Sequence, residues 1–178
     1  MRSISLHRPK EKLRGINRRL NALDKWADSF KDYFPTEYSE EKYCNWKIPV
    51  LDRMVNRPTT TKELQAHCAN ALFKAASYIE DAKPEALKTA KVSVLLTHPD
   101  MFSSEICVFF DEQYFEWFFD RNGEEHKLTK LSSGSLAKEL NLIIPQGFSE
   151  IGYQSIMKNE YDGEVSIHKE NWWFYCKI

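Results

Sequence analysis

The chain has 178 residues, with 25 Lys and Arg against 26 Asp and Glu, and 13% of its residues are aromatic. So much aromatic surface excludes a disordered chain, and a chain of this length folds without disulfides or a metal. Its apolar runs fall far short of the about 20 residues that a membrane span needs. The composition therefore predicts a single domain over residues 1–178, with no membrane partner.

The first predicted element is a long amphipathic helix over residues 9–34. Seven apolar side chains recur there at alternating spacings of three and four, which places them on one stripe. We expect two of them, Leu20 and Leu23, in the core. The opposite face is open to three interpretations: a solvated surface, a two-chain coiled coil, or a nucleic-acid site whose cations meet phosphates. The basic residues on that face are Arg14, Arg18 and Lys25.

A second helix is predicted over residues 61–82. Thr60 and Glu63 have the spacing of a capping box, in which each side chain satisfies the other residue's free backbone N–H. The apolar face of this helix is rich in alanine, which indicates close approach of another element. A polar connection precedes it and contains a short segment at Trp46–Val50.

From residue 91 the apolar period changes from 3.6 toward 2, which is typical of strands. Two turns are indicated by Asn122-Gly123 and Asp162-Gly163, and the first favours strands on both of its sides. Tyr114–Phe119 before that turn is ambiguous, since it fits a strand or a helix capped by Asp111. A short helix is expected over Ser133–Leu140. The predicted strands are 92–97, Ile106–Phe110, 128–131, Ile151–Met157, Glu164–His168 and Trp172–Ile178.

The order of these elements predicts an α+β fold. N-terminal helices would pack on a mostly antiparallel sheet, which residues 91–178 mainly supply. Charge is uneven along the chain: residues 1–25 carry a strong positive excess, and residues 105–125 an equally strong negative one. Such polarity indicates either an electrostatic partner or docking of the two segments on each other.

The loop after the first predicted strand is the richest polar cluster. His98 there is a candidate general base, with Asp100 or Glu105 to orient it and Ser103 or Ser104 as nucleophile. The same residue types also build ordinary turns. Further along, Ser135 precedes the short helix, where an N-cap explains it better than phosphate binding or the S-x-x-K motif.

Cysteines and histidines show no metal-ligand spacing, so neither a metal nor any other cofactor is expected. Each cysteine lies among apolar neighbours, as buried structural thiols do, and the first residues lack the apolar core of a signal peptide. Both features predict a cytoplasmic protein. The cysteines are Cys44, Cys68, Cys107 and Cys176.

The pair Trp172-Trp173 puts one indole on each face of the last strand. One indole is expected in the core, and the other is a candidate exposed anchor for a partner.

Four stretches together resemble a bacterial domain family of unknown function. The resemblance spans nearly the whole chain and implies a bacterial cytoplasmic protein of one domain, without implying an activity. The stretches are residues 14–20, 47–50, 102–110 and 172–174.

We therefore expect a non-catalytic protein-binding module, such as an immunity-type inhibitor of a toxin. Nucleic-acid binding through the basic helix is the alternative, and a hydrolase built on the His98 loop comes third. The oligomeric state stays open.

Overall fold

The computed structural model describes residues 16–35, 42–49, 62–98, 101, 103–120, 126–161 and 164–177. Several predicted features lie outside these residues: the start of the first helix, the capping residue Thr60, and the turn at residues 122–123. The candidate residues Arg14 and Asp100 lie outside them as well.

Within the described residues, six strands form one sheet in the order β1-β3-β2-β6-β5-β4. Every neighbouring pair is antiparallel, which confirms the predicted α+β fold. The strands are β1 (Tyr43–Lys47), β2 (Lys91–His98), β3 (Glu105–Phe109), β4 (His126–Lys130), β5 (Phe148–Tyr161) and β6 (Glu164–Lys177).

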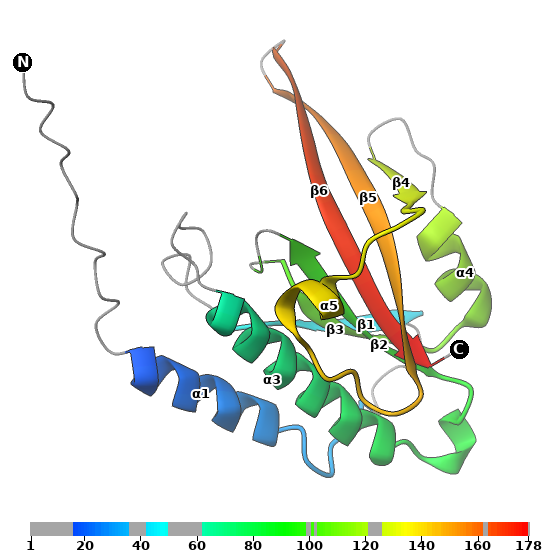
Figure 1. Ribbon diagram of the computed structural model, residues 1–178. Helices are drawn as coiled ribbons and strands as arrows, with labels where there is room; N and C mark the ends of the chain where they lie inside the picture. Colours follow the sequence, from blue (N-terminus) through cyan, green and yellow to red (C-terminus); the bar gives the residue numbers. More distant parts are fainter. Residues whose placement is uncertain are drawn as a thin grey trace, which may run out of the picture.

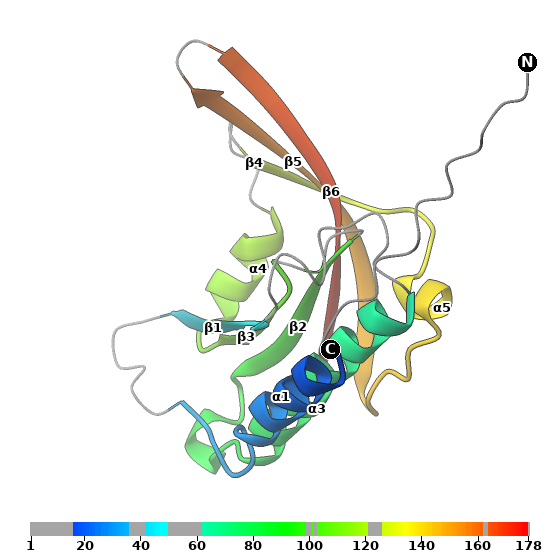
Figure 2. The same cartoon turned by 90° about the vertical axis from the view of Figure 1, so that its left-hand side faces the viewer.

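Helices cover both faces of this sheet (Figures 1 and 2). Three of them enclose a large core on one face, and α4 encloses a smaller aromatic core on the other. None of the described helices is long and apolar enough to cross a membrane. The helices are α1 (Ile16–Asp28), α3 (Lys62–Asp81), α4 (Glu112–Asp120) and α5 (Leu136–Leu140), with a 3-10 turn at Glu85–Leu87.

The first helix ends earlier than predicted. It stops at Asp28, and residues 29–32 turn instead of continuing it to residue 34. The hydroxyl of Ser29 donates to the carbonyl oxygen of Trp26 at 2.6 Å, an alternative to the helical backbone bond. Asp32 has a positive φ of 59°, which no right-handed helix accommodates.

The apolar stripe is largely buried even so, over the part that the structure describes from Leu20 to Phe34. Leu23 lies in the large core as predicted, whereas Leu20 is only half-buried. Phe30 and Phe34 are buried although they follow the end of the helix. The regular spacing therefore predicts which residues reach the core. It predicts helical structure correctly only as far as Asp28.

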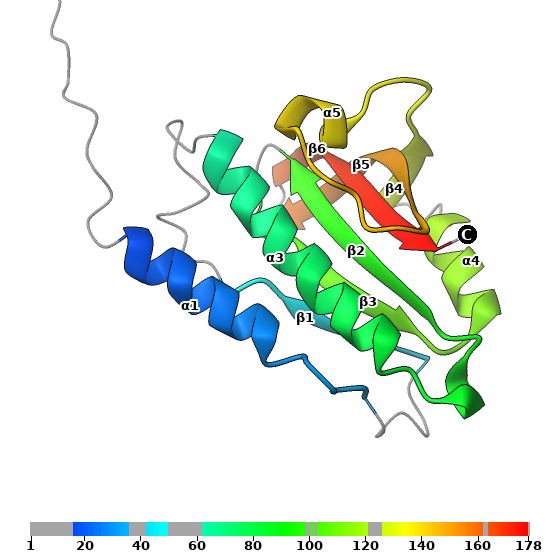
Figure 3. The same cartoon turned by 60° about the horizontal axis from the view of Figure 1, so that its bottom comes forward.

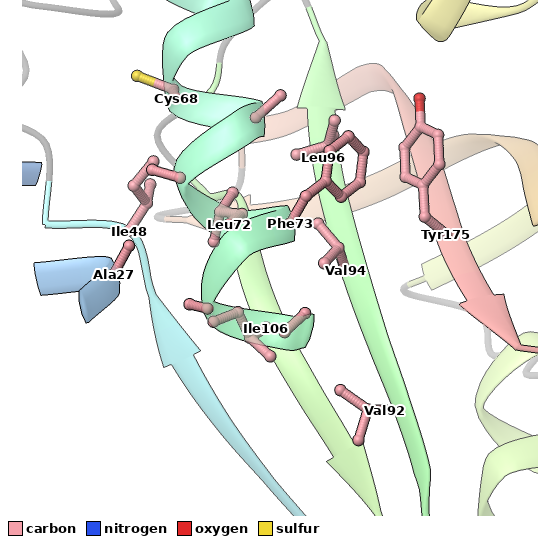
Figure 4. Close-up of a cluster of buried hydrophobic side chains, with 14 of the residues drawn as sticks. Ala27, Ile48, Cys68, Leu72, Phe73, Val92, Val94, Leu96, Ile106 and Tyr175 are labelled. Atoms are coloured by element: carbon pink, nitrogen blue, oxygen red, sulfur yellow. The ribbon is translucent and has the colours of Figure 1, made fainter. Parts of the chain in front are cut away.

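The second helix agrees with its prediction, and its alanines explain how closely it packs. α3 runs beside α1 and along β2, over one face of the sheet (Figure 3). Ala69, Ala75 and Ala76 are fully buried, as the alanine-rich face predicted. Leu72 and Phe73 point from α3 toward the sheet, where they meet β2, β3 and β6 (Figure 4).

The ambiguous segment before residue 122 is a helix. The Asp111 carboxylate accepts a hydrogen bond from the backbone N–H of Tyr114 at 2.7 Å and caps α4. Phe118 and Phe119 then pack on Phe174 of β6, with ring centroids 5.7 and 4.6 Å away. The strand that the turn at residues 122–123 favoured on its N-terminal side was therefore a wrong prediction.

The C-terminal part of the sheet is a single long hairpin. We predicted three strands there, but β5 and β6 are two strands of 14 residues each. The polar residues 169–171, which suggested a break, continue β6 and pair with Ile156, Ser155 and Gln154. They are polar because the hairpin leaves the core at this point. The chain does not turn here.

A glycine lets this hairpin hold a tryptophan. Gly152 pairs with Trp173, and a Cβ built at residue 152 would lie 2.5 Å from Cζ3 of the indole. Such a contact is far inside van der Waals distance, so β5 needs glycine here to let the indole lie flat on the strand.

Candidate functional site

The hairpin has two halves with opposite surroundings. In the near half, residues 172–176 of β6 are all buried between the two cores. In the far half, residues 164–169 of β6 are all exposed. Figures 1 and 2 show this half projecting beyond the helices. We call residues 156–161 and 164–169 the arm.

One face of the arm combines apolar side chains with lysines, and we call it the lysine face. Side chains alternate along β6, so Val165, Ile167 and Lys169 lie on the same face as Trp173. Val165 is 53% exposed and Ile167 63%. Lys158 pairs with Ile167 across the hairpin. The next row across three strands is Lys127, Ile156 and Lys169.

The other face of the arm is acidic and polar. Glu164, Ser166 and His168 alternate there with the residues of the lysine face and are exposed. At the base of the arm, Glu170 Oε1 accepts a hydrogen bond from Trp172 Nε1 at 2.5 Å. His168 Nε2 lies 3.7 Å from Glu170 Oε2. The two faces of the arm differ in charge, because Lys127, Lys158 and Lys169 outnumber Glu160, which pairs with Val165 on the lysine face.

The arm also has an open edge. β6 pairs with β2 only as far as Asn171, which lies opposite His98. Between Glu164 and Glu170, no strand of the described residues pairs with β6 on the side away from β5. Every second residue of such an edge directs its backbone N–H and C=O outward, where another strand can bind them.

Among the candidate hydrolase residues that the structure describes, His98 and Glu105 lie on opposite faces of the sheet. His98 extends the face of Leu96 and lies 3.9 Å from Glu139 of α5. Glu105 is the cross-strand partner of Leu95 and therefore lies on the other face of the sheet from His98. Its carboxylate accepts a hydrogen bond from Asn45 at 2.5 Å. Ser103 is exposed. Ser104 is buried, and its hydroxyl accepts from the backbone N–H of Thr97.

The remaining candidates are placed as follows. Arg18 and Lys25 are exposed on α1. Trp172 and Trp173 lie on opposite faces of β6, as predicted, but both are buried. The expectation of one exposed indole was therefore wrong, because α4 covers one face of the near half and α3 and α5 cover the other. Ser135 is the N-cap of α5, and its hydroxyl accepts from the N–H of Lys138 at 3.2 Å.

A cavity of about 430 Å³ lies between α4 and the sheet, lined by Phe115, Phe119, Tyr153 and Cys176 among others. Burial raises the pKa of the Cys176 thiol, although Lys91 nearby acts in the opposite direction. The thiol is therefore protonated and a poor nucleophile at neutral pH. Burial also raises the pKa of Cys68, to about 12.

The arm was not predicted as a site from the sequence. Part of the arm, residues 156–157 and 164–168, lies within predicted strands, and the alternation of Val165 and Ile167 with polar neighbours was visible. Alternation of this kind normally marks a half-buried strand. Only the pairing pattern reveals that nothing in the described chain covers this apolar side.

Comparison with known proteins gives a family without a known activity. No curated protein and no solved structure matches the chain. The family described as "Protein of unknown function (DUF3916)" matches residues 24–177, which include the arm, the smaller core and all of the large core except Leu23 of its buried members. The chain therefore belongs to this family of unknown function.

Proposed function

We propose that the protein is a non-catalytic protein-binding module and that the arm is its contact surface. The observation that carries this proposal is the exposure of Val165 and Ile167 on a projecting hairpin. Both side chains lie outside the two cores. Burying them against a partner would yield about 1.5–3 kcal/mol for each fully buried side chain, before the costs of association.

The placement of His98 and Glu105 supports a binding role over a catalytic one. A general base and its orienting carboxylate need hydrogen-bond contact. The sheet separates His98 from Glu105, and Glu105 is engaged with Asn45. An immunity-type inhibitor is one specific form of this proposal, and a toxin gene beside the gene of this protein would support it.

Nucleic-acid binding through α1 is the second candidate, favoured by the exposure of Arg18 and Lys25. The same helix carries acidic residues that already pair with α3. Asp24 lies 3.0 Å from His67, and Asp28 lies 2.6 Å from Lys74. Fluorescence anisotropy at about 0.15 M salt tests this candidate, since a dissociation constant tighter than about 10⁻⁶ M would exceed non-specific binding.

The test of the main proposal is site-specific photocrosslinking in the cells that make the protein. A photoreactive amino acid replaces Ile167 in one variant and Ile143 in the other. Ile143 is a matched control because it is also an isoleucine and is 87% exposed, in the loop after α5. The protein crosslinked at residue 167 is identified, purified and titrated by calorimetry against the wild type and the double variant V165S/I167S.

We expect one protein to crosslink at residue 167 and not at residue 143. The double variant should bind it at least about tenfold more weakly, since about 1.4 kcal/mol of lost apolar contact gives that ratio. Equal affinity of the two forms, or the same adduct at both positions, would contradict the proposal.

A further inference from the structure

We propose that the open edge of β6, residues 164–170, binds an extended, carboxylate-bearing segment of the partner protein as an added strand. This inference rests on the proposed function and adds the chemistry of the partner. The binding mode would be strand addition, in which backbone hydrogen bonds give affinity and alternate side chains give specificity.

In the part of the chain that the structure describes, the sheet provides a docking edge along β6. β2 pairs with residues 171–176 of β6. The last pair is His98 of β2 with Asn171 of β6, and the pairing stops there. From Glu170 outward β6 continues for seven residues with β5 as its described ladder partner. An added strand would therefore pair with the edge of β6 that faces away from β5, beyond the point where β2 ends its pairing.

The side chains along this edge favour a particular partner. On the lysine face, an added strand meets Val165, Ile167 and Lys169 in alternation. Opposite-charge and apolar pairs stabilise neighbouring strands. The fitting segment therefore carries apolar residues opposite Val165 and Ile167, and a carboxylate opposite Lys169. Lys127 and Lys158 add positive charge to the same face.

The charges disfavour a second copy of the chain at this edge. In antiparallel self-pairing centred on Ile167, Glu164 of each copy lies directly opposite Glu170 of the other copy. Like charges in such positions destabilise a sheet. An exposed lysine on an edge strand, such as Lys169, is also a known device against edge-to-edge association.

The side chains also disfavour nucleic acid on the arm. Arginine is the residue that best fits phosphates and guanine edges, and none of the described arm residues is an arginine. The acidic face, with Glu164 and Glu170, would repel a phosphate backbone that wraps the hairpin. An extended protein segment can bind both the outward backbone groups of β6 and the side chains of Val165 and Ile167. A nucleic acid would use neither of them.

The experiment is an NMR titration of the full-length protein with a synthetic peptide. The probe is the acetylated and amidated heptapeptide Thr-Glu-Thr-Val-Thr-Ile-Thr. In antiparallel pairing its glutamate lies opposite Lys169, its valine opposite Ile167 and its isoleucine opposite Val165. We expect shifts of the backbone amide signals of residues 164–170, and none in α1.

Backbone methylation of the peptide identifies strand addition. One form is N-methylated on its even-numbered residues and the other on its odd-numbered residues. Only one of these alternate sets faces the arm. One form should therefore bind at least about tenfold more weakly, because it loses two or three hydrogen bonds, and the other should bind as before. Equal effects of both methylations would overturn the inference.

A charge exchange tests the carboxylate. K169E should weaken binding of the glutamate peptide and strengthen binding of the same peptide with lysine in place of glutamate. K31E is the matched control, because Lys31 is exposed in the turn after α1 and should leave both affinities unchanged. Loss of binding without this reversal would overturn the assignment of an acidic partner.

The remaining outcomes separate this inference from the proposed function. Absence of any shift at millimolar peptide would overturn strand addition, as would self-association of the free protein through residues 164–170. The same shifts with duplex DNA would overturn it in favour of nucleic acid. The proposed function fails if the crosslinked partner binds the wild type and V165S/I167S equally, or if the same adduct forms at residues 167 and 143.

Discussion

The two halves of β6 share the same neighbour, β5, but lie in opposite environments. Residues 172–176 are buried on both faces, under α3 and α5 on one side and α4 on the other. Residues 164–169 are exposed on both faces. A strand does not need to extend beyond its core to be stable, so packing on the two cores does not explain the far half. Mutations in the two halves should therefore have different consequences.

The largest effect is expected in the large core, against which the near half packs. Leu72 of α3 is fully buried there. L72A should lower the free energy of unfolding by about 2–5 kcal/mol, because it removes apolar contacts and leaves a cavity. Urea denaturation measures the change, and I143A at an exposed position is the control. A loss below about 1 kcal/mol would mean that α3 packs loosely on the sheet.

A smaller effect is expected where β5 approaches the indole of Trp173. G152A places a Cβ within 2.5 Å of that ring and should cost about 1–3 kcal/mol by overpacking. Combining it with W173F should recover part of the loss relative to the sum of the single changes. Additive losses in urea denaturation would show that the contact is not the cause.

A hydrogen bond in the near half gives the third effect. The hydroxyl of Tyr175 donates to Glu150 Oε2 at 2.6 Å, and the backbone N–H of Ala137 donates to the same oxygen at 2.8 Å. Y175F should cost about 1–2 kcal/mol, since it leaves a half-buried carboxylate with fewer donors. Y78F is the control, because the hydroxyl of Tyr78 makes only a long, exposed bond of 3.4 Å to Asp28. Similar losses in both variants would contradict this assignment.

The smallest effect on stability is expected in the arm. V165S/I167S should change the free energy of unfolding by less than about 0.5 kcal/mol, because exposed side chains away from special features contribute little. Thermal and urea denaturation check this prediction. A loss comparable to that of G152A would show that the arm belongs to the folding unit and would weaken its assignment as a contact surface.

The sequence predicted the presence of most helices and strands, but it predicted less well where each of them ends. The apolar periods located α3, β2 and β3, because periodicity is a local signal. The polar residues 169–171 suggested a turn, since sequence alone does not distinguish a strand that leaves its core from a strand that ends. The partners of Glu150 lie 13 and 25 residues away, so no local signal pointed to it. The open edge of β6 likewise depends on where β2 ends its pairing.

Amide hydrogen exchange tests the contrast between the two halves most directly. In the free protein, the amides of residues 172–176 should exchange only through global unfolding, because β2 and β5 pair with β6 on both sides. The outward amides of residues 164–170 should exchange fast and become protected when the partner crosslinked at residue 167 is added. Equal protection of both segments in the free protein, or no slowing with the partner, would contradict the account.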